Sequence, residues 1–177
     1  MNKMESLEVR IRDEAPGDLS AVHSLHEQAF ETKAEAELVD LLRARGKAVI
    51  SLVAERDREI VGHMLFSPLS IEPPAPGWKA LGLAPLAVIP RLQRQGIGSK
   101  LVKSGLQHCR MLGIDLVFVL GHPHYYPKFG FRPASTFGFE NEYQADQAFM
   151  LIEINPGVSV RYQGLVKYAP EFNELDL

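Results

Sequence analysis

The pattern of apolar and polar positions predicts strands and helices that follow one another along the whole chain. Residues 7–12 alternate apolar and charged side chains, which is typical of a half-buried strand. Two amphipathic helices are expected next, one beginning after Asp18 and one running from about Ala34 to Arg45. Three apolar runs with tight connections then predict an antiparallel meander, over residues 48–57, 59–72 and 78–89.

The second half of the chain contains the clearest helical pattern. Apolar residues recur at helical spacing from Ile97 to Leu112, and Gly113 is suited to end this helix. The continuous apolar run over residues 114–121 is typical of a buried strand. A strand, a helix and a second strand form a βαβ unit, so the two strands should be parallel. A short helix or turn is expected near 123–130, and the last strands over residues 131–135, 148–154 and 159–168.

The predicted order of elements is β-α-α-β-β-β-α-β-α-β-β, an α/β fold with a mixed central sheet and helices on both faces. No internal repeat or long linker divides the 177 residues, so we expect one domain over 1–177 with its core at about 7–168. No apolar run approaches the ~20 residues of a membrane span, which argues against a membrane protein. The first residues lack the apolar segment of a secretory signal, and the only cysteine is Cys109. These features favour the cytoplasm.

Charge is distributed unevenly along this acidic chain, whose formal net charge is −3. Residues 91–110 carry five basic side chains and no acid, whereas residues 137–160 carry four acids and no base. One local basic zone in an acidic protein suggests a small anionic ligand, since nucleic acid usually requires a broad basic face. Solvent-exposed helix faces would explain the same charges without any ligand.

The segment "QRQGIG" at residues 93–98 lies between a predicted strand and the first turn of a helix. The first amides of a helix lack internal partners and carry partial positive charge, so a pyrophosphate fits there. The same sequence could also be only the sharp turn that joins a strand to a helix. Position 101 is Leu, so the dinucleotide fingerprint G-x-G-x-x-G fails, and the spacing of a Walker loop is absent too.

Two longer segments resemble one known family. "AVIPRLQRQGIGSKLV" resembles the acetyl-coenzyme A loop of the GNAT N-acetyltransferase superfamily, Gln/Arg-x-x-Gly-x-Gly/Ala, through Gln93, Gly96 and Gly98. "YYPKFGF" at 125–131 resembles the Tyr-x-Lys-x-Gly-Phe signature of the superfamily, with Tyr126 in the first place. The segments "FSPLSI", "LAPLAV" and "GHPHYYPKFGF" are most similar to the YhbS-like predicted acyltransferases. That branch usually has Asp where this chain has His122, so a role that needs a carboxylate there is in doubt.

The resemblance implies the GNAT acyl-CoA N-acyltransferase fold, in which two parallel strands splay apart at the cofactor site. It implies transfer of an acetyl or other acyl group from acetyl-coenzyme A to a primary amine by direct attack. The strand should pair with the pantetheine arm through Leu86, Ala87 and Val88, and Arg91, Lys100 or Lys103 could reach the 3′-phosphate. The loop should hold the pyrophosphate through Gln93, Arg94, Gln95, Gly96, Ile97, Gly98, Ser99 and Lys100.

At the reacting end, the resemblance implies that Tyr126 is the general acid for the departing thiolate. The alternative is a packed tyrosine whose hydroxyl has a backbone partner. The general base stays open among water and four acids, namely Glu27, Glu31, Glu35 and Glu72. Cys109 lies on the apolar face of a helix and is expected to be an inert buried thiol.

The partners are less well defined by the sequence. In this fold the acceptor is selected by the first two helices and the loops near 31–35, 67–76 and 136–147, and their acidic bias favours a cationic amine on a small molecule or protein. No spacing of His, Cys and acidic residues completes a metal site, even with the pairs His23/His26 and His122/His124, so we expect no metal. We expect no nucleic acid partner, no membrane, and a monomer or homodimer. The alternative function is a non-catalytic GNAT-like module that binds coenzyme A as a sensor or interaction partner.

Overall fold

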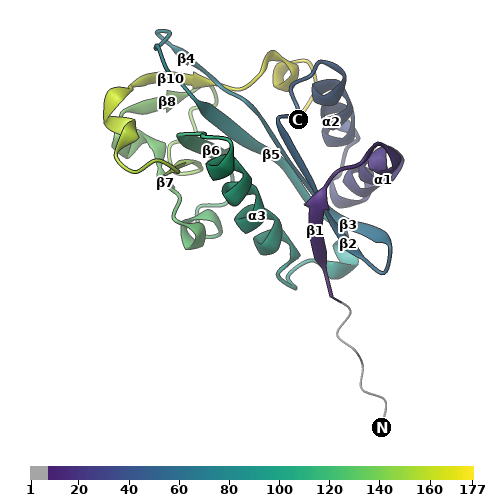
Figure 1. Ribbon diagram of the computed structural model, residues 1–177. Helices are drawn as coiled ribbons and strands as arrows, with labels where there is room; N and C mark the ends of the chain where they lie inside the picture. The colour runs from purple at the N-terminus through teal and green to yellow at the C-terminus, as the bar shows by residue number, and fades with distance from the viewer. Residues whose placement is uncertain (1–7) are drawn as a thin grey trace.

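The strands of this protein form two sheets, and one stretch of chain runs from the larger sheet directly into the smaller one (Figure 1). A computed structural model describes residues 8–177, so Leu7, the first residue of the expected strand 7–12, lies outside it. The larger sheet has the order β1-β2-β3-β5-β6-β9-β7, and the smaller one has the order β4-β10-β8. The strands are β1 (Arg10–Asp13), β2 (Ile50–Arg56), β3 (Glu59–Pro68), β4 (Ser70–Glu72), β5 (Ala80–Val88), β6 (Leu116–Leu120), β7 (Arg132–Pro133), β8 (Phe139–Asn141), β9 (Phe149–Glu153) and β10 (Gly164–Lys167).

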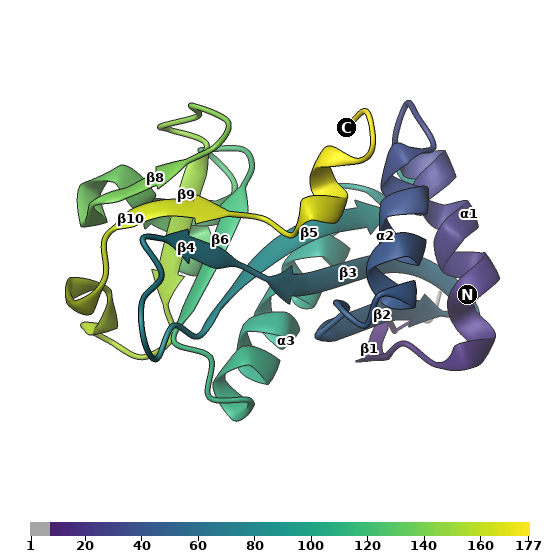
Figure 2. The same ribbon diagram turned by 90° about the horizontal axis from the view of Figure 1, so that it is seen from above.

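Three α-helices cover the larger sheet, two on one face and one on the other (Figure 2). They are α1 (Leu19–Ala29), α2 (Ala34–Ala44) and α3 (Ile97–Met111). Successive residues of β3 face opposite sides of the larger sheet, which explains why helices pack on both of its faces. Gly62 lies against Ile97 and Leu101 of α3, whereas the next residue, His63, contacts α1. The predicted helices on both faces of a mixed sheet are confirmed, as is the parallel pairing of β5 with β6.

The remaining helical segments are short 3₁₀ turns at the ends of strands and helices. They are η1 (Pro16–Asp18), η2 (Pro90–Leu92), η3 (Tyr126–Phe129), η4 (Ala134–Phe137), η5 (Val158–Arg161) and η6 (Pro170–Asn173). The short helix or turn expected near 123–130 is therefore confirmed as η3.

The structure corrects the predicted strands in the outer parts of the fold. The run 59–72 is two strands in two sheets, since Pro68 lacks the N–H that would continue β3. The run 159–168 contains the turn η5 before the short strand β10. The strand expected over 131–135 keeps only the two residues of β7, and β8 was not predicted. These strands are short, so the alternation that identifies a strand has little length in which to develop.

The core fills the space between the sheets and helices in two apolar clusters. One lies between α3 and the larger sheet around Met64 and Phe66, and the other lies under α2 and the smaller sheet around Leu38 and Phe118. Within residues 8–177, no helix is long and apolar enough to cross a membrane.

Candidate active site

The strands β5 and β6 separate at the centre of the larger sheet. They pair only over Ala80–Leu83 and Leu116–Val119, but β5 continues to Val88 while still paired with β3. The amide of Ile89 donates to Val61 on the β3 side. Because backbone groups alternate along a strand, Leu86 and Val88 direct their N–H and C=O groups to the other edge. Within the described chain no strand pairs with that edge beyond Leu83, so it is open to a ligand.

The open edge leads into the loop between η2 and α3. Here six consecutive amides, from Arg94 to Ser99, donate no hydrogen bond to any residue in the range 8–177. The first amide bonded within the helix is that of Lys100, which lies 3.1 Å from the carbonyl of Gly96. Gly96 has φ 85° and Arg94 has φ 61°, so both take left-handed backbone that suits glycine. A loop that holds Arg94 in this conformation with its amides free is prepared for an anion.

A cleft of about 350 Å³ follows this edge and loop. The cleft is lined by Leu86, Val88, Leu92, Gln93, Arg94, Gly96, Ile97, Gly98, Ser99, Tyr125 and Lys128. Its opposite wall thus comes from η3, where the ammonium of Lys128 lies 3.9 Å from the ring centroid of Tyr125. The sequence identified Lys128 only as a motif residue, and the fold brings it to the basic side of this cleft.

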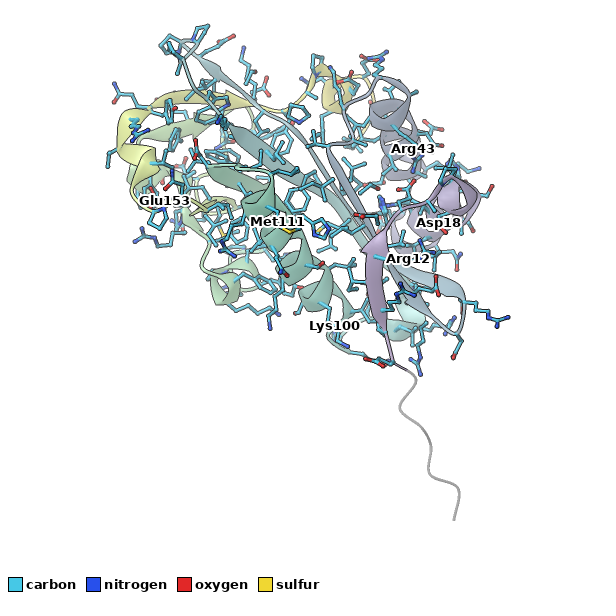
Figure 3. The ribbon with its side chains drawn as sticks, viewed as in Figure 1. Arg12, Asp18, Arg43, Lys100, Met111 and Glu153 are labelled. Atoms are coloured by element: carbon cyan, nitrogen blue, oxygen red, sulfur yellow. The ribbon has the colours of Figure 1, made fainter. Side chains whose placement is uncertain are left out.

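Three of the predicted binding residues do not line the cleft. Ala87 faces the α1 side of β5, opposite His63. The side-chain amide of Gln95 lies 3.4 Å from the carbonyl of Arg91. Lys100 is exposed on the first turn of α3 (Figure 3).

Two other polar residues predicted near the loop already have partners. Gln93 donates from Nε2 to the carbonyl of Val88 at 3.0 Å, which fixes the loop to the end of β5. Arg91 pairs with Glu59 through Nη2 and Oε2, 2.6 Å apart. Arg94 and Lys128 are therefore the cations that line the cleft itself.

Tyr126 does not line this cleft but follows Tyr125, which does, and it is only 7% exposed. Its ring packs edge-on against those of Tyr125 and Phe131, with centroids 5.0 and 5.6 Å apart. Over residues 8–177 its hydroxyl makes no hydrogen bond, which disfavours the alternative of a tyrosine held by a backbone partner. Burial raises the pKa of Tyr126, and the neighbouring Tyr125 raises it further, so the phenol stays protonated. A protonated and unpaired hydroxyl on a largely buried ring is suited to donate a proton.

A second and larger pocket, of about 830 Å³, is lined by Tyr126. It shares Leu86 and Tyr125 with the first cleft and continues along Pro85 toward the end of α1 at Phe30. The sequence did not predict its outer wall, which is formed by the C-terminal segment beside α2 (Figure 2). The two cavities thus meet at the side chains of β5 and η3.

Only one of the four candidate bases lines the second pocket. That residue is Glu35, which accepts a hydrogen bond from the hydroxyl of Thr32 at 3.3 Å. Glu27 pairs with Lys33, and Glu72 pairs with Lys167. Of the two residues His122 and His124, His122 lines this pocket.

A chain of buried polar groups lies on the α1 side of the larger sheet. Nε2 of His26 is 2.8 Å from Nδ1 of His63, whose Nε2 is 3.0 Å from Glu14 and 2.8 Å from Ser51. Arg43 extends from α2 (Figure 3) and reaches Glu14 at 2.6 Å. From the sequence, His26 was considered as one of the pair His23/His26 and was given no role. The sequence feature that could have indicated this buried polar chain is His63, a lone histidine within an apolar strand.

The protonation of this chain follows from its surroundings. Burial would raise the pKa of Glu14, but hydrogen bonds from His63 and Ser51 and the charge of Arg43 outweigh it and lower the pKa to about 2. Burial, together with His63 and Arg43, lowers the pKa of His26 to about 3, and burial also lowers the pKa of His63. Glu14 is therefore ionised and accepts from His63 Nε2, so His63 Nδ1 accepts from His26.

The remaining candidates for chemistry are structural. Cys109 is fully buried, and burial raises the pKa of its thiol to about 12, so it is not a nucleophile at neutral pH. His23 pairs with Asp40 through Nδ1 and Oδ2, 2.7 Å apart. Among the residues that the structure describes, no group of three or more His, Cys, Asp or Glu side chains could hold a metal ion.

Comparisons with known proteins extend these observations. Residues 10–134 match the family described as "Acetyltransferase (GNAT) domain". The Escherichia coli protein named "Uncharacterized N-acetyltransferase YhbS" is 33% identical over 165 residues, which is 92% of this chain and 98% of YhbS. The E. coli protein named "Uncharacterized N-acetyltransferase YjhQ" is 38% identical over 120 residues, 67% of this chain and 66% of YjhQ.

Solved structures match across the whole fold. The crystal structure of E. coli YhbS in complex with CoA has a TM-score of 0.92 and 31% identity, and the match covers 100% of this chain and 98% of that one. A GNAT family acetyltransferase from Brucella melitensis in complex with acetyl-CoA has a TM-score of 0.77 and 34% identity, covering 93% of this chain and 98% of that one.

Proposed function

Because the chain belongs to the GNAT family of acetyltransferases, we propose that it transfers an acetyl group from acetyl-coenzyme A to a primary amine. The observation that carries the proposal is the unpaired edge of β5, which leads directly into six free amides at the start of α3. A strand edge suits an extended chain that contains amides, and a helix start suits a pyrophosphate. Coenzyme A has both groups in that order.

The residues along the cleft fit this ligand. The N–H and C=O of Leu86 and the N–H of Val88 would pair with its pantetheine arm, since Gln93 already bonds the carbonyl of Val88. The loop amides, with Gly98 leaving room above the helix, would hold the pyrophosphate. Arg94 and Lys128 would add the balancing positive charge. Acetyl-coenzyme A supplies the activated thioester carbonyl that an amine attacks.

The reacting centre is expected where the two cavities meet. An amine that enters through the larger pocket would reach a carbonyl placed beside Leu86 and Tyr126. Tyr126 would hydrogen-bond to the departing sulfur and give its proton as negative charge develops there, because its raised pKa keeps the phenol protonated until that point.

The acceptor must also lose a proton, since only a neutral amine attacks. Glu35 would attract a protonated amine to the larger pocket, because its carboxylate lines that pocket. Water in this exposed part of the pocket can then take the proton.

The test is a thiol-release assay with acetyl-coenzyme A and a panel of primary amines, together with a direct titration of coenzyme A binding. The proposal expects both binding and amine-dependent thiol release. Tight binding without release from any amine would instead support a coenzyme A sensor. An absence of binding would overturn the proposed ligand.

A further inference from the structure

The larger pocket is mainly apolar. Its walls are mainly aliphatic and aromatic, including Leu38, Leu83, Tyr168 and Phe172, each less than 10% exposed. We propose that this pocket selects small primary amines that carry an aromatic or branched aliphatic body. The inference rests on the proposed acetyltransferase function and assigns the class of its acceptor.

The aromatic residues form one continuous surface along the outer wall. The ring centroids of Tyr143 and Tyr168 are 6.2 Å apart, and those of Tyr168 and Phe172 are 4.9 Å apart. Phe30 at the end of α1 faces the same cavity from another element. Planar and branched apolar groups pack well on such rings and remove them from water.

Exposed apolar side chains also gather at the mouth of this pocket. Eight large apolar residues are exposed in residues 8–177, and three of them, Leu120, Tyr143 and Leu177, line it. The three come from β6, the loop before β9 and the C-terminal segment, so the fold rather than the sequence brings them together. A patch of this kind beside an active cleft indicates a ligand with an apolar surface.

The charges of the pocket fit one ammonium group and not several. Apart from tyrosines, the ionisable side chains that line it are Glu35 and His122. A polyamine would bring two or more charges against apolar walls, where an unpaired charge is strongly unfavourable. A monoamine needs only one such partner and buries the rest of its surface.

The C-terminal segment limits the size of the acceptor. Glu171 and Glu174 on and after η6 pair with Arg45 at the end of α2, and Lys47 also reaches Glu171 at 2.8 Å. These ion pairs hold Phe172 and Leu175 in the wall. The volume of about 830 Å³ is within the usual range of small-molecule sites.

The test compares two amines of similar basicity, 2-phenylethylamine and ethanolamine, with acetyl-coenzyme A as donor. We expect kcat/KM to be about tenfold or more higher for 2-phenylethylamine, because burial of its ring is favourable. The variant Tyr143→Ser should reduce that preference several-fold and leave the KM for acetyl-coenzyme A unchanged. The matched control is Val160→Ser, since Val160 is 87% exposed and lies outside the pocket.

Each other outcome overturns the inference in a distinguishable way. If kcat/KM for ethanolamine or 1,4-diaminobutane equals that for 2-phenylethylamine, the acceptor class is wrong while the acetyltransferase function stands. If hexanoyl-coenzyme A is preferred to acetyl-coenzyme A and Tyr143→Ser removes that preference, the pocket holds an acyl chain instead. If coenzyme A binds but no amine is acetylated, both the acceptor class and the proposed function fail.

Discussion

The hydroxyl of Tyr125 lies 3.0 Å from the position that a Cβ atom at Gly98 would occupy. Gly98 belongs to the glycine loop at the start of α3, and Tyr125 precedes η3. The same hydroxyl is 3.5 Å from Oγ of Ser99. The two segments that resemble family motifs are therefore opposite walls of one cleft, and the glycine provides the space between them.

A larger side chain at Gly98 should block the cleft without unfolding the protein. The variant Gly98→Glu is expected to weaken binding of coenzyme A by about tenfold or more, since it fills the space and repels a pyrophosphate. The helix should tolerate the change, because an acidic residue in the first turn interacts favourably with the helix dipole. Titration calorimetry measures the affinity.

The matched control for that variant is Gln107→Glu, which adds the same charge at an exposed position of α3. Its affinity for coenzyme A should equal that of the natural chain. Equal affinity of Gly98→Glu would remove the phosphate-binding role of the loop.

Gly121 fixes the position of Tyr126. A Cβ atom at Gly121 would collide with Cε2 of the Tyr126 ring. The variant Gly121→Ala is therefore expected to displace the ring and lower kcat several-fold, while the affinity for coenzyme A stays within about twofold. Steady-state kinetics with thiol detection measures both quantities.

The control for this change is Gly17→Ala, because no atom lies within 4 Å of the added Cβ and the residue does not have positive φ. That variant should keep the natural kcat. A Gly121→Ala protein with natural kcat would show that the position of the Tyr126 ring is not critical.

The buried histidines predict how stability depends on pH. Both have lowered pKa values in the folded chain, so below about pH 6.5 the unfolded chain binds protons that the folded chain does not. The free energy of unfolding should therefore fall as pH decreases from about 6.5 toward 5, by about 1.4 kcal/mol per pH unit for each histidine at the steepest. Glu14 has a lowered pKa too, so its contribution is present above about pH 4.5 and is lost below it.

Urea denaturation at a series of pH values measures this slope. The variant His26→Phe should reduce this slope by the amount that corresponds to about one proton, because the unfolded chain then has one histidine fewer to protonate. His124→Gln is the control, since His124 is exposed and should leave the slope unchanged. An unaltered slope in His26→Phe would mean that His26 is accessible to protons in the folded chain.

The cleft was expected from two short motifs and their resemblance to one family, since the loop pattern alone left a simple turn open. Gly96 and Gly98 lie between a strand and a helix that are continuous in sequence, so their neighbours in space follow from their neighbours in the chain. The position of Tyr126 follows from its neighbours in the chain in the same way, because η3 directly follows β6. The antiparallel pairing of β2, β3 and β5 and the parallel pairing of β5 with β6 follow for the same reason.

Contacts between distant segments could not be predicted in this way. His26 and His63 are separated by 37 residues, and each looks like a core residue in its own element. The lining of the larger pocket brings together the end of α1, the loop before β9 and the C-terminal segment. Only tertiary packing brings such positions together, and no periodicity within one element records it.

The general-acid role of Tyr126 is the central claim, and one kinetic comparison tests it most directly. The natural chain and Tyr126→Phe are compared for acetyl-coenzyme A-dependent acetylation of the best amine in the panel. The variant should lose about tenfold or more in kcat, because it retains the ring but not the proton. Its KM for acetyl-coenzyme A should stay within about twofold. An unchanged kcat in a folded Tyr126→Phe protein would contradict the account.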